Sequence, residues 1–180
     1  MHVGKTAWAA LLATQCALGA HAATCTTERI NGERVLVPNC GDGSCAQYAV
    51  GDATYDLGFG GPEPDGISFE FYKTGGIPEL GNFSLTTNVN DNYATCEQCI
   101  LILQDFVAGE PTKTFFQSSG NLIVSGDAAP GVADQLTLIW SNLTLVEVTI
   151  DPNTFESTPV LGGACYDVLP EVVYADGFDA

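Results

Sequence analysis

The feature that most constrains the fold of this chain is a succession of short segments in which apolar and polar residues alternate. Residues 67–73 show the pattern clearly, because Ile67, Phe69 and Phe71 fall on one side of an extended strand and other residues separate them. The β-branched and aromatic residues of such segments suit a half-buried pleated sheet. Segments of this kind, or equally short apolar runs, occupy residues 33–38, 45–50, 53–58, 67–73, 82–87, 99–106, 112–119, 121–126, 135–141 and 143–151.

The stretches between these segments carry turn residues. They are rich in Gly, Pro and Asp, which set the backbone angles of tight turns. We interpret Gly120 as a hairpin turn or a bulge, and two further segments meet at Asn142. The clearest turn-rich stretches are residues 58–66, 73–81, 126–131 and 157–163. About ten short strands without an amphipathic helical pattern predict an all-β fold, an antiparallel β-sandwich or jelly roll.

The N-terminus has the pattern of a signal peptide. Lys5 precedes an apolar run over residues 7–20, and residues 20–22 form an A-x-A cleavage box. The run is too short to span a bilayer, and we expect no transmembrane segment elsewhere. We therefore predict a signal peptide over residues 1–22, a β-sandwich domain over 23–170 and an acidic tail over 171–180. The predicted localisation is secreted, periplasmic or at the outer cell surface.

Cleavage changes the number of cysteines from odd to even. It removes Cys16 from the seven cysteines. An even set in an exported chain indicates a disulfide-stapled domain, and six cysteines allow fifteen pairings. One of these pairings joins Cys96 to Cys99, Cys40 to Cys45, and Cys25 to Cys165, but the sequence does not choose it over the others. The six disulfide candidates are Cys25, Cys40, Cys45, Cys96, Cys99 and Cys165.

Composition excludes several classes of function. The predicted cleavage also removes His2 and His21, so the exported chain would lack the imidazole of a Ser-His-Asp site. The formal net charge of −17 disfavours nucleic acid as a partner, because a phosphate backbone would be repelled. The motif that Cys96 and Cys99 form is C-x-x-C, but the acidic Glu97 between them disfavours a reactive thiolate.

Calcium is the cofactor that the sequence leaves open. Hard cations prefer oxygen ligands, and two stretches of the chain are rich in side-chain oxygens. The alternative is that these residues form Asx turns between strands. The candidate calcium ligands are Asn90, Asp91, Asn92, Asp151 and Asn153.

Recognition of an extracellular ligand is the function that we expect. Aromatic side chains on a sheet face stack on sugar rings, and Trp140 is the candidate binding residue. We expect a non-catalytic binding or interaction module for an extracellular ligand, glycan or protein. One alternative is a calcium-stabilised structural or adhesive domain, and another is a hydrolase such as a glycosidase that uses paired carboxylates. The carboxylates available for such catalysis are Glu70, Asp105, Glu147, Asp151 and Glu156.

Three stretches of the chain resemble a group of uncharacterised exported proteins of Gram-negative soil bacteria. The stretches read NDNYATCEQCILILQD, KTFFQSSGNLIV and LTLVEVTIDPNTFESTPVLGGACY, and the resemblance covers roughly residues 53–166. It implies no activity, but it implies that Cys165 is the closing cysteine of a structural disulfide. Residues 173–180 are similar to a short acidic ending of exported bacterial proteins, which implies a sorting or processing tag. A disordered acidic end is the alternative.

Overall fold

The computed structural model describes residues 24–30, 36–38, 47–50, 56–72, 78–126 and 136–174. Within these ranges eleven strands form one sheet, and the helical segment is a short 3-10 turn, η1 (Asn88–Asp91). The all-β prediction is confirmed. The strands are β1 (Thr26–Glu28), β2 (Leu36–Pro38), β3 (Gln47–Val50), β4 (Gly66–Phe71), β5 (Gly81–Ser84), β6 (Gln98–Val107), β7 (Glu110–Ser125), β8 (Thr137–Ile150), β9 (Ser157–Pro159), β10 (Cys165–Val168) and β11 (Val172–Tyr174).

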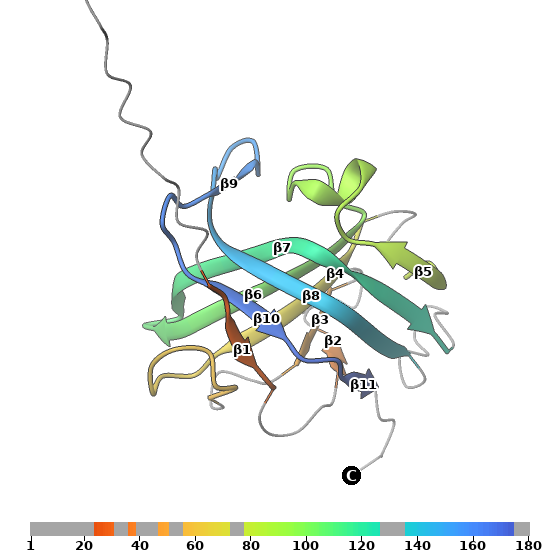
Figure 1. The fold of residues 1–180 in the computed structure, drawn as a ribbon, viewed down its shortest axis with the longest axis horizontal. Helices are drawn as coiled ribbons and strands as arrows, with labels where there is room; N and C mark the ends of the chain where they lie inside the picture. Colours follow the sequence, from red (N-terminus) through yellow and green to blue (C-terminus); the bar gives the residue numbers. More distant parts are fainter. Residues whose placement is uncertain are drawn as a thin grey trace, which may run out of the picture.

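The sheet is mixed, and the two long strands β7 and β8 run through its centre (Figure 1). The main order is β1-β10-β8-β7-β6-β4-β3-β2, while β5 pairs with β7, and β9 and β11 pair with β8. The β1–β10 pair is parallel, and the other described pairs are antiparallel. The described strands form one continuous sheet, so the sandwich or jelly roll within the all-β prediction is not confirmed.

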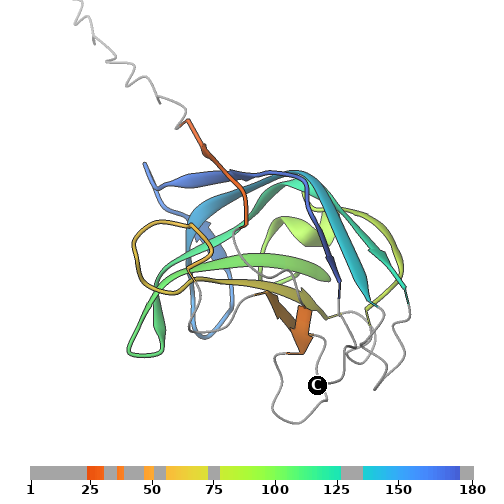
Figure 2. The ribbon, with the colours of Figure 1, turned by 90° about the horizontal axis from the view of Figure 1, so that it is seen from below.

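This sheet curls so that its two halves face each other (Figure 2). The rings of Phe69 in β4 and Trp140 in β8 lie 5.7 Å apart, although β6 and β7 separate these strands in the sheet order. The hydroxyl of Tyr166 in β10 likewise donates to Gln104 Oε1 in β6 at 3.2 Å. A continuous, strongly twisted sheet buries its apolar face in this way against itself.

The main core fills the concave face of the curl. Alternation places Ile67, Phe69 and Phe71 of β4 in it, as the sequence predicts. The loop ahead of β4 closes one side with Leu57 and Phe59, which are both buried. The other members of this core are Ile30, Leu85, Ile100, Ile102, Phe115, Leu122, Val124, Leu136, Leu138, Trp140, Leu143, Leu145, Tyr166 and Val168.

A paired irregularity bends β7 and β8 at the same level. The register shifts between Gln117 and Asn121, Gly120 has a φ of 129°, and Asn142 opposite has a φ of 51°. A Cβ on Gly120 would lie 3.0 Å from Leu143 Cα, so only glycine fits without displacement of β8. The bulge interpretation of Gly120 is confirmed, and each of the two predicted strand pairs is one bent strand.

A second, smaller apolar cluster lies on the convex face. Leu101 and Phe116 point away from the main core and pack with Val148. The segment between β5 and β6 covers them, with Cys96 and Cys99 buried in the same cluster. This segment carries the candidate site described below.

Two of the disulfide pairs considered from the sequence are confirmed. Cys25 bonds to Cys165 across a separation of 140 residues, and Cys96 bonds to Cys99 across 3. The first bond joins the residue before β1 to the first residue of β10, and β1 pairs with β10 in the sheet. Cys40 and Cys45 lie outside the described residues.

Two boundaries differ from the sequence prediction. Residues 56–58, expected to end a strand, lie in a loop, because the Asp56 carboxylate accepts the amide of Gly58 at 2.8 Å and bends the chain. The domain also extends past residue 170, because β11 pairs with β8 through Val172–Tyr174. Residues 175–180, and with them most of the predicted tail, lie outside the described residues.

Candidate functional site

The segment between β5 and β6 is anchored by the buried side chain of Asn90. Its Nδ2 donates to Ser84 O at 3.1 Å and to Gln98 Oε1 at 2.9 Å. Its Oδ1 accepts the amides of Glu97 at 3.0 Å and Gln98 at 3.1 Å. All the hydrogen-bonding capacity of the carboxamide is thus used to close this segment onto itself.

Two further amides fix the segment to the sheet and to β9. Gln117 Nε2 donates to the backbone oxygens of Asn90 and Gln98, each at 2.9 Å. Asn92 exchanges hydrogen bonds with the backbone of Ser157, donating at 3.1 Å and accepting at 3.2 Å. The β8–β9 turn and η1 therefore lie at the same end of the sheet (Figure 1).

A pocket of about 410 Å³ opens between the β8–β9 turn and residues 93–97, which follow η1. We call it the aromatic pocket, because Tyr72, Tyr93 and Phe155 supply its rings. Tyr72 and Phe155 are 51% and 56% exposed, and the Tyr72 and Tyr93 rings meet edge to face at 6.5 Å. The remaining lining comes from residues 94–97. Its volume lies within the usual range of small-molecule sites.

Glu70 lies behind the tyrosines and is only 7% exposed. Its Oε2 accepts the hydroxyl of Tyr72 at 2.5 Å and that of Tyr93 at 2.9 Å, and its Oε1 accepts the hydroxyl of Ser68 at 3.1 Å. The ion pairs between described residues are Arg29–Glu171 and Lys113–Glu147, so neither involves Glu70. Three hydroxyl groups, rather than a basic side chain, hold this carboxylate.

The same contacts keep Tyr93 protonated. Burial raises the pKa of Tyr93 well above the ordinary tyrosine value, and the Tyr72 hydroxyl and the negative charge of Glu70 raise it further. The Tyr93 ring also packs edge to face on Phe116, with the ring centroids 5.9 Å apart, so the second apolar cluster holds it in place. The Tyr93 ring and hydroxyl are thus positioned before any ligand arrives.

Phe155 reaches the aromatic pocket from a strained turn. Asp151 Oδ1 accepts the amides of Asn153 at 2.8 Å and Thr154 at 2.9 Å, and its backbone oxygen accepts the amide of Phe155 at 2.8 Å. Phe155 has a φ of 59°, a left-handed conformation that bulky residues rarely adopt. The turn therefore projects an exposed aromatic ring at a conformational cost.

The structure places the candidate calcium ligands in two neighbouring turns. The Asn90 and Asn92 oxygens accept backbone amides, Asp91 is exposed, and Asp151 caps its own turn as in the Asx-turn alternative. The hydrogen bonds that the backbone amides of Thr154 and Asn153 donate to the Asp151 carboxyl lower its pKa. No group of three His, Cys, Asp or Glu residues in the described ranges is arranged to hold a metal ion. Calcium binding stays a prediction.

Trp140 does not lie at a surface. Its side chain is 0% exposed, and its Nε1 donates to Leu169 O at 2.9 Å. The interpretation of Trp140 as a stacking residue for a ligand is therefore corrected to a core residue. The indole N–H finds a partner inside, which lets the ring be buried completely.

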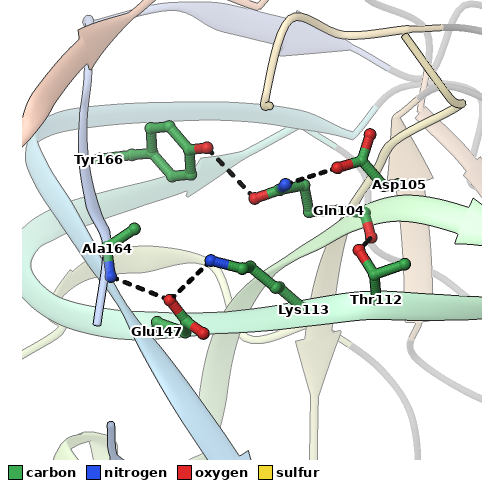
Figure 3. A network of polar contacts seen from close by, with 7 residues as sticks. All are labelled: Gln104, Asp105, Thr112, Lys113, Glu147, Ala164 and Tyr166. Atoms are coloured by element: carbon green, nitrogen blue, oxygen red, sulfur yellow. Dashed lines mark hydrogen bonds and ion pairs between the residues drawn. The ribbon is translucent and has the colours of Figure 1, made fainter. Parts of the chain in front are cut away.

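Two of the carboxylates considered for hydrolysis make structural contacts (Figure 3). Glu147 Oε2 accepts the amide of Ala164 at 2.9 Å and pairs with Lys113 at 3.1 Å, and these contacts lower its pKa. Asp105 accepts a hydrogen bond from the backbone amide of Gly61 at 3.0 Å and another from the side-chain amide of Gln104 at 2.6 Å. A lowered pKa makes Glu147 a poor proton donor at neutral pH, and the hydrolase alternative stays a prediction.

Sequence reasoning missed the three rings of the aromatic pocket. The signal present was the period of β4, because Ser68, Glu70 and Tyr72 share the face opposite the core residues. A carboxylate flanked by two hydroxyl residues on one strand face indicates a polar site. No local pattern relates this strand to Tyr93 or Phe155, which arrive through the docking of distant segments.

Comparisons with protein-family models, with curated proteins and with solved structures give no match to this chain. The resemblance to exported proteins of soil bacteria therefore stays a prediction. No helix in the described part of the chain combines the length and the apolar character needed to cross a membrane.

Proposed function

We propose that this chain is an exported, non-catalytic binding protein of the periplasm, cell surface or extracellular medium, with the aromatic pocket as its ligand site. The pattern of the first 22 residues supports export. The disulfides Cys25–Cys165 and Cys96–Cys99 suit an oxidising compartment.

The observation that carries the proposal is the exposed aromatic lining over a buried carboxylate. A folded protein gains little by exposing Tyr72 and Phe155 at one spot, and exposed aromatic patches are typical of binding surfaces. Rigid aromatic rings supply contact area at a low cost in side-chain entropy. The rings are preorganised by Glu70, Phe116 and the turn at Asp151, which favours affinity.

A ligand panel of sugars, organic cations, amino acids and short peptides tests the proposal. Binding is followed by the shift of the melting temperature, first for the purified exported protein and then for Phe155→Ala. We expect at least one panel member to raise the melting temperature of the wild type and to lose this effect in Phe155→Ala. The matched control is Leu161→Ala, which removes a fully exposed side chain that does not line the pocket.

Two results would contradict the proposal. One is a panel that gives no shift with the wild type at any concentration. The other is a ligand whose effect survives Phe155→Ala, which would place its site elsewhere. A second hollow, between Thr27, Asn142 and Asp167, is the surface to examine in that case.

A further inference from the structure

The aromatic pocket presents hydrogen-bond acceptors and negative charge to a ligand. Tyr72 and Tyr93 each have one hydroxyl hydrogen, and each donates it to Glu70 Oε2. Toward a ligand these two oxygens can therefore act only as acceptors. Glu97 adds a carboxylate to the lining itself. A ligand that donates hydrogen bonds or carries positive charge fits this arrangement better than an anion does.

The rings around this space favour a cation as well. An ammonium group is attracted to the face of an aromatic ring, and several rings in different planes form a cage around it. The Tyr72 and Tyr93 rings are inclined at 76°, and Phe155 comes from a separate turn. Each hydrogen bond to the Glu70 carboxylate pushes electron density onto its phenol, which strengthens the attraction of the ring for positive charge.

The charge of the whole chain acts in the same direction. The sequence has 22 acidic and 5 basic residues, and Glu70 is held without a basic partner among the described residues. A potential of this sign raises the local concentration of cations and repels anions. Among the described residues, three hydroxyl groups hold the buried carboxylate.

We propose that the aromatic pocket binds a small organic cation with an alkylated ammonium group, held by the rings of Tyr72, Tyr93 and Phe155 in front of Glu70. This inference rests on the proposed function, of which it names the ligand class. The ammonium group makes cation–π contacts with the rings, and the Glu70 charge behind them compensates its charge. Recognition depends on charge as well as on shape.

The test compares choline with its neutral carbon isostere, 3,3-dimethylbutan-1-ol, by titration calorimetry on the purified exported protein. The two probes have nearly the same shape and differ in charge. We expect choline to bind at least about tenfold more tightly than the isostere, as cation–π contacts with several rings imply. We also expect Glu70→Gln to weaken choline binding about tenfold and to leave the affinity for the isostere unchanged.

Controls separate lost binding from lost folding. Phe155→Ala changes an exposed residue and should also lose choline binding while it keeps a cooperative melting transition. Leu161→Ala should bind choline like the wild type. If Glu70→Gln does not fold, Phe155→Ala and the comparison of the two probes still decide the question.

The outcomes distinguish the two proposals. Equal binding of choline and the isostere at the pocket overturns the inference of a cationic ligand and leaves the binding module intact. Binding of a neutral sugar at the pocket, with no binding of choline, does the same. If no member of the ligand panel binds, both the ligand class and the proposed function are overturned.

Discussion

The hydroxyl of Tyr93 donates a hydrogen bond to the buried carboxylate of Glu70 at 2.9 Å, although 23 residues separate them in the sequence. The contact joins the segment that covers the convex face to β4, a strand of the main sheet. It therefore connects the packing of the second apolar cluster to the geometry of the aromatic pocket. A change at either residue is expected to affect both.

Replacement of Tyr93 by phenylalanine tests this connection through pH. The Tyr93 pKa is raised above the unfolded value of about 10. Below pH 10 both states hold the proton, and the stabilisation is fully present. Above it the unfolded state releases a proton that the folded state retains, so the free energy of unfolding falls as pH rises.

We expect this fall between pH 9 and 11 to be shallower in Tyr93→Phe than in the wild type. Denaturant unfolding at several pH values measures it. Tyr166 also has a raised pKa through burial, so a residual fall should remain in the variant. Identical slopes for the two proteins would contradict the assignment to Tyr93.

Phe155 offers a test of strain at the aromatic pocket. A residue with a Cβ is strained at a φ of 59°, whereas glycine is not. We therefore expect Phe155→Gly to be more stable than Phe155→Ala by about 1 kcal/mol, which reverses the usual order of these residues. Both variants should lose ligand binding, because both lack the ring.

Thermal and denaturant unfolding of the two Phe155 variants measure the difference. Leu161→Gly and Leu161→Ala are the comparison pair in the neighbouring loop after β9, and the left-handed non-glycine residues described do not include Leu161. The glycine variant should not be the more stable one there. If the glycine variant is less stable than the alanine variant at both positions, the turn does not strain Phe155.

Gly120 tests the paired bulge of β7 and β8. Alanine there would require a φ of 129° and would bring its Cβ to 3.0 Å from Leu143 Cα. We expect Gly120→Ala to lower the free energy of unfolding by about 3 kcal/mol, through strain and contact with the β8 backbone. Gly109→Ala is the matched control, because Gly109 has a φ of 90° with open space around it.

Gly109→Ala should lower the free energy of unfolding by about 1 kcal/mol, because alanine there meets only the conformational cost of a positive φ. The excess at Gly120 therefore reports the close approach of the two strands. A Gly120→Ala variant no less stable than Gly109→Ala would show that β7 and β8 do not approach as described.

Asn90 tests the anchor of the segment that carries Tyr93. Asn90→Ala leaves the buried groups at Gln98 and Ser84 without their partner. We expect a loss of about 2–4 kcal/mol in the free energy of unfolding. Asn121→Ala, at an exposed position of β7, should change it by less than about 0.5 kcal/mol. Similar losses in the two variants would contradict the anchoring role.

Local pattern accounts for the part of the fold that the sequence predicts. The alternation of Ile67, Phe69 and Phe71 identifies β4, because a period of two is decided within the strand itself. The strands β1, β9, β10 and β11 are only three or four residues long, and their pairing with longer strands defines them. Gly120 and Asn142 interrupt the alternation of β7 and β8, so the sequence pattern predicts two short strands in place of each long one.

The candidate site is less predictable, for a related reason. Asn90 and Asn92 belong to an oxygen-rich run that suits both calcium ligands and structural amides, and only the tertiary contacts give each oxygen its donor. Trp140 has the same local context as a surface aromatic residue, but the curl of the sheet covers it. The contact of Tyr93 with Glu70 depends on the same long-range docking.

The measurement that tests the central claim most directly is an NMR titration of the exported protein with choline, followed through the backbone amide resonances. The account predicts concentration-dependent shifts of residues 93–97 and Phe155, with little change around Thr144 and Asp167. Shifts confined to that second hollow, or no shifts at saturating choline, would contradict it.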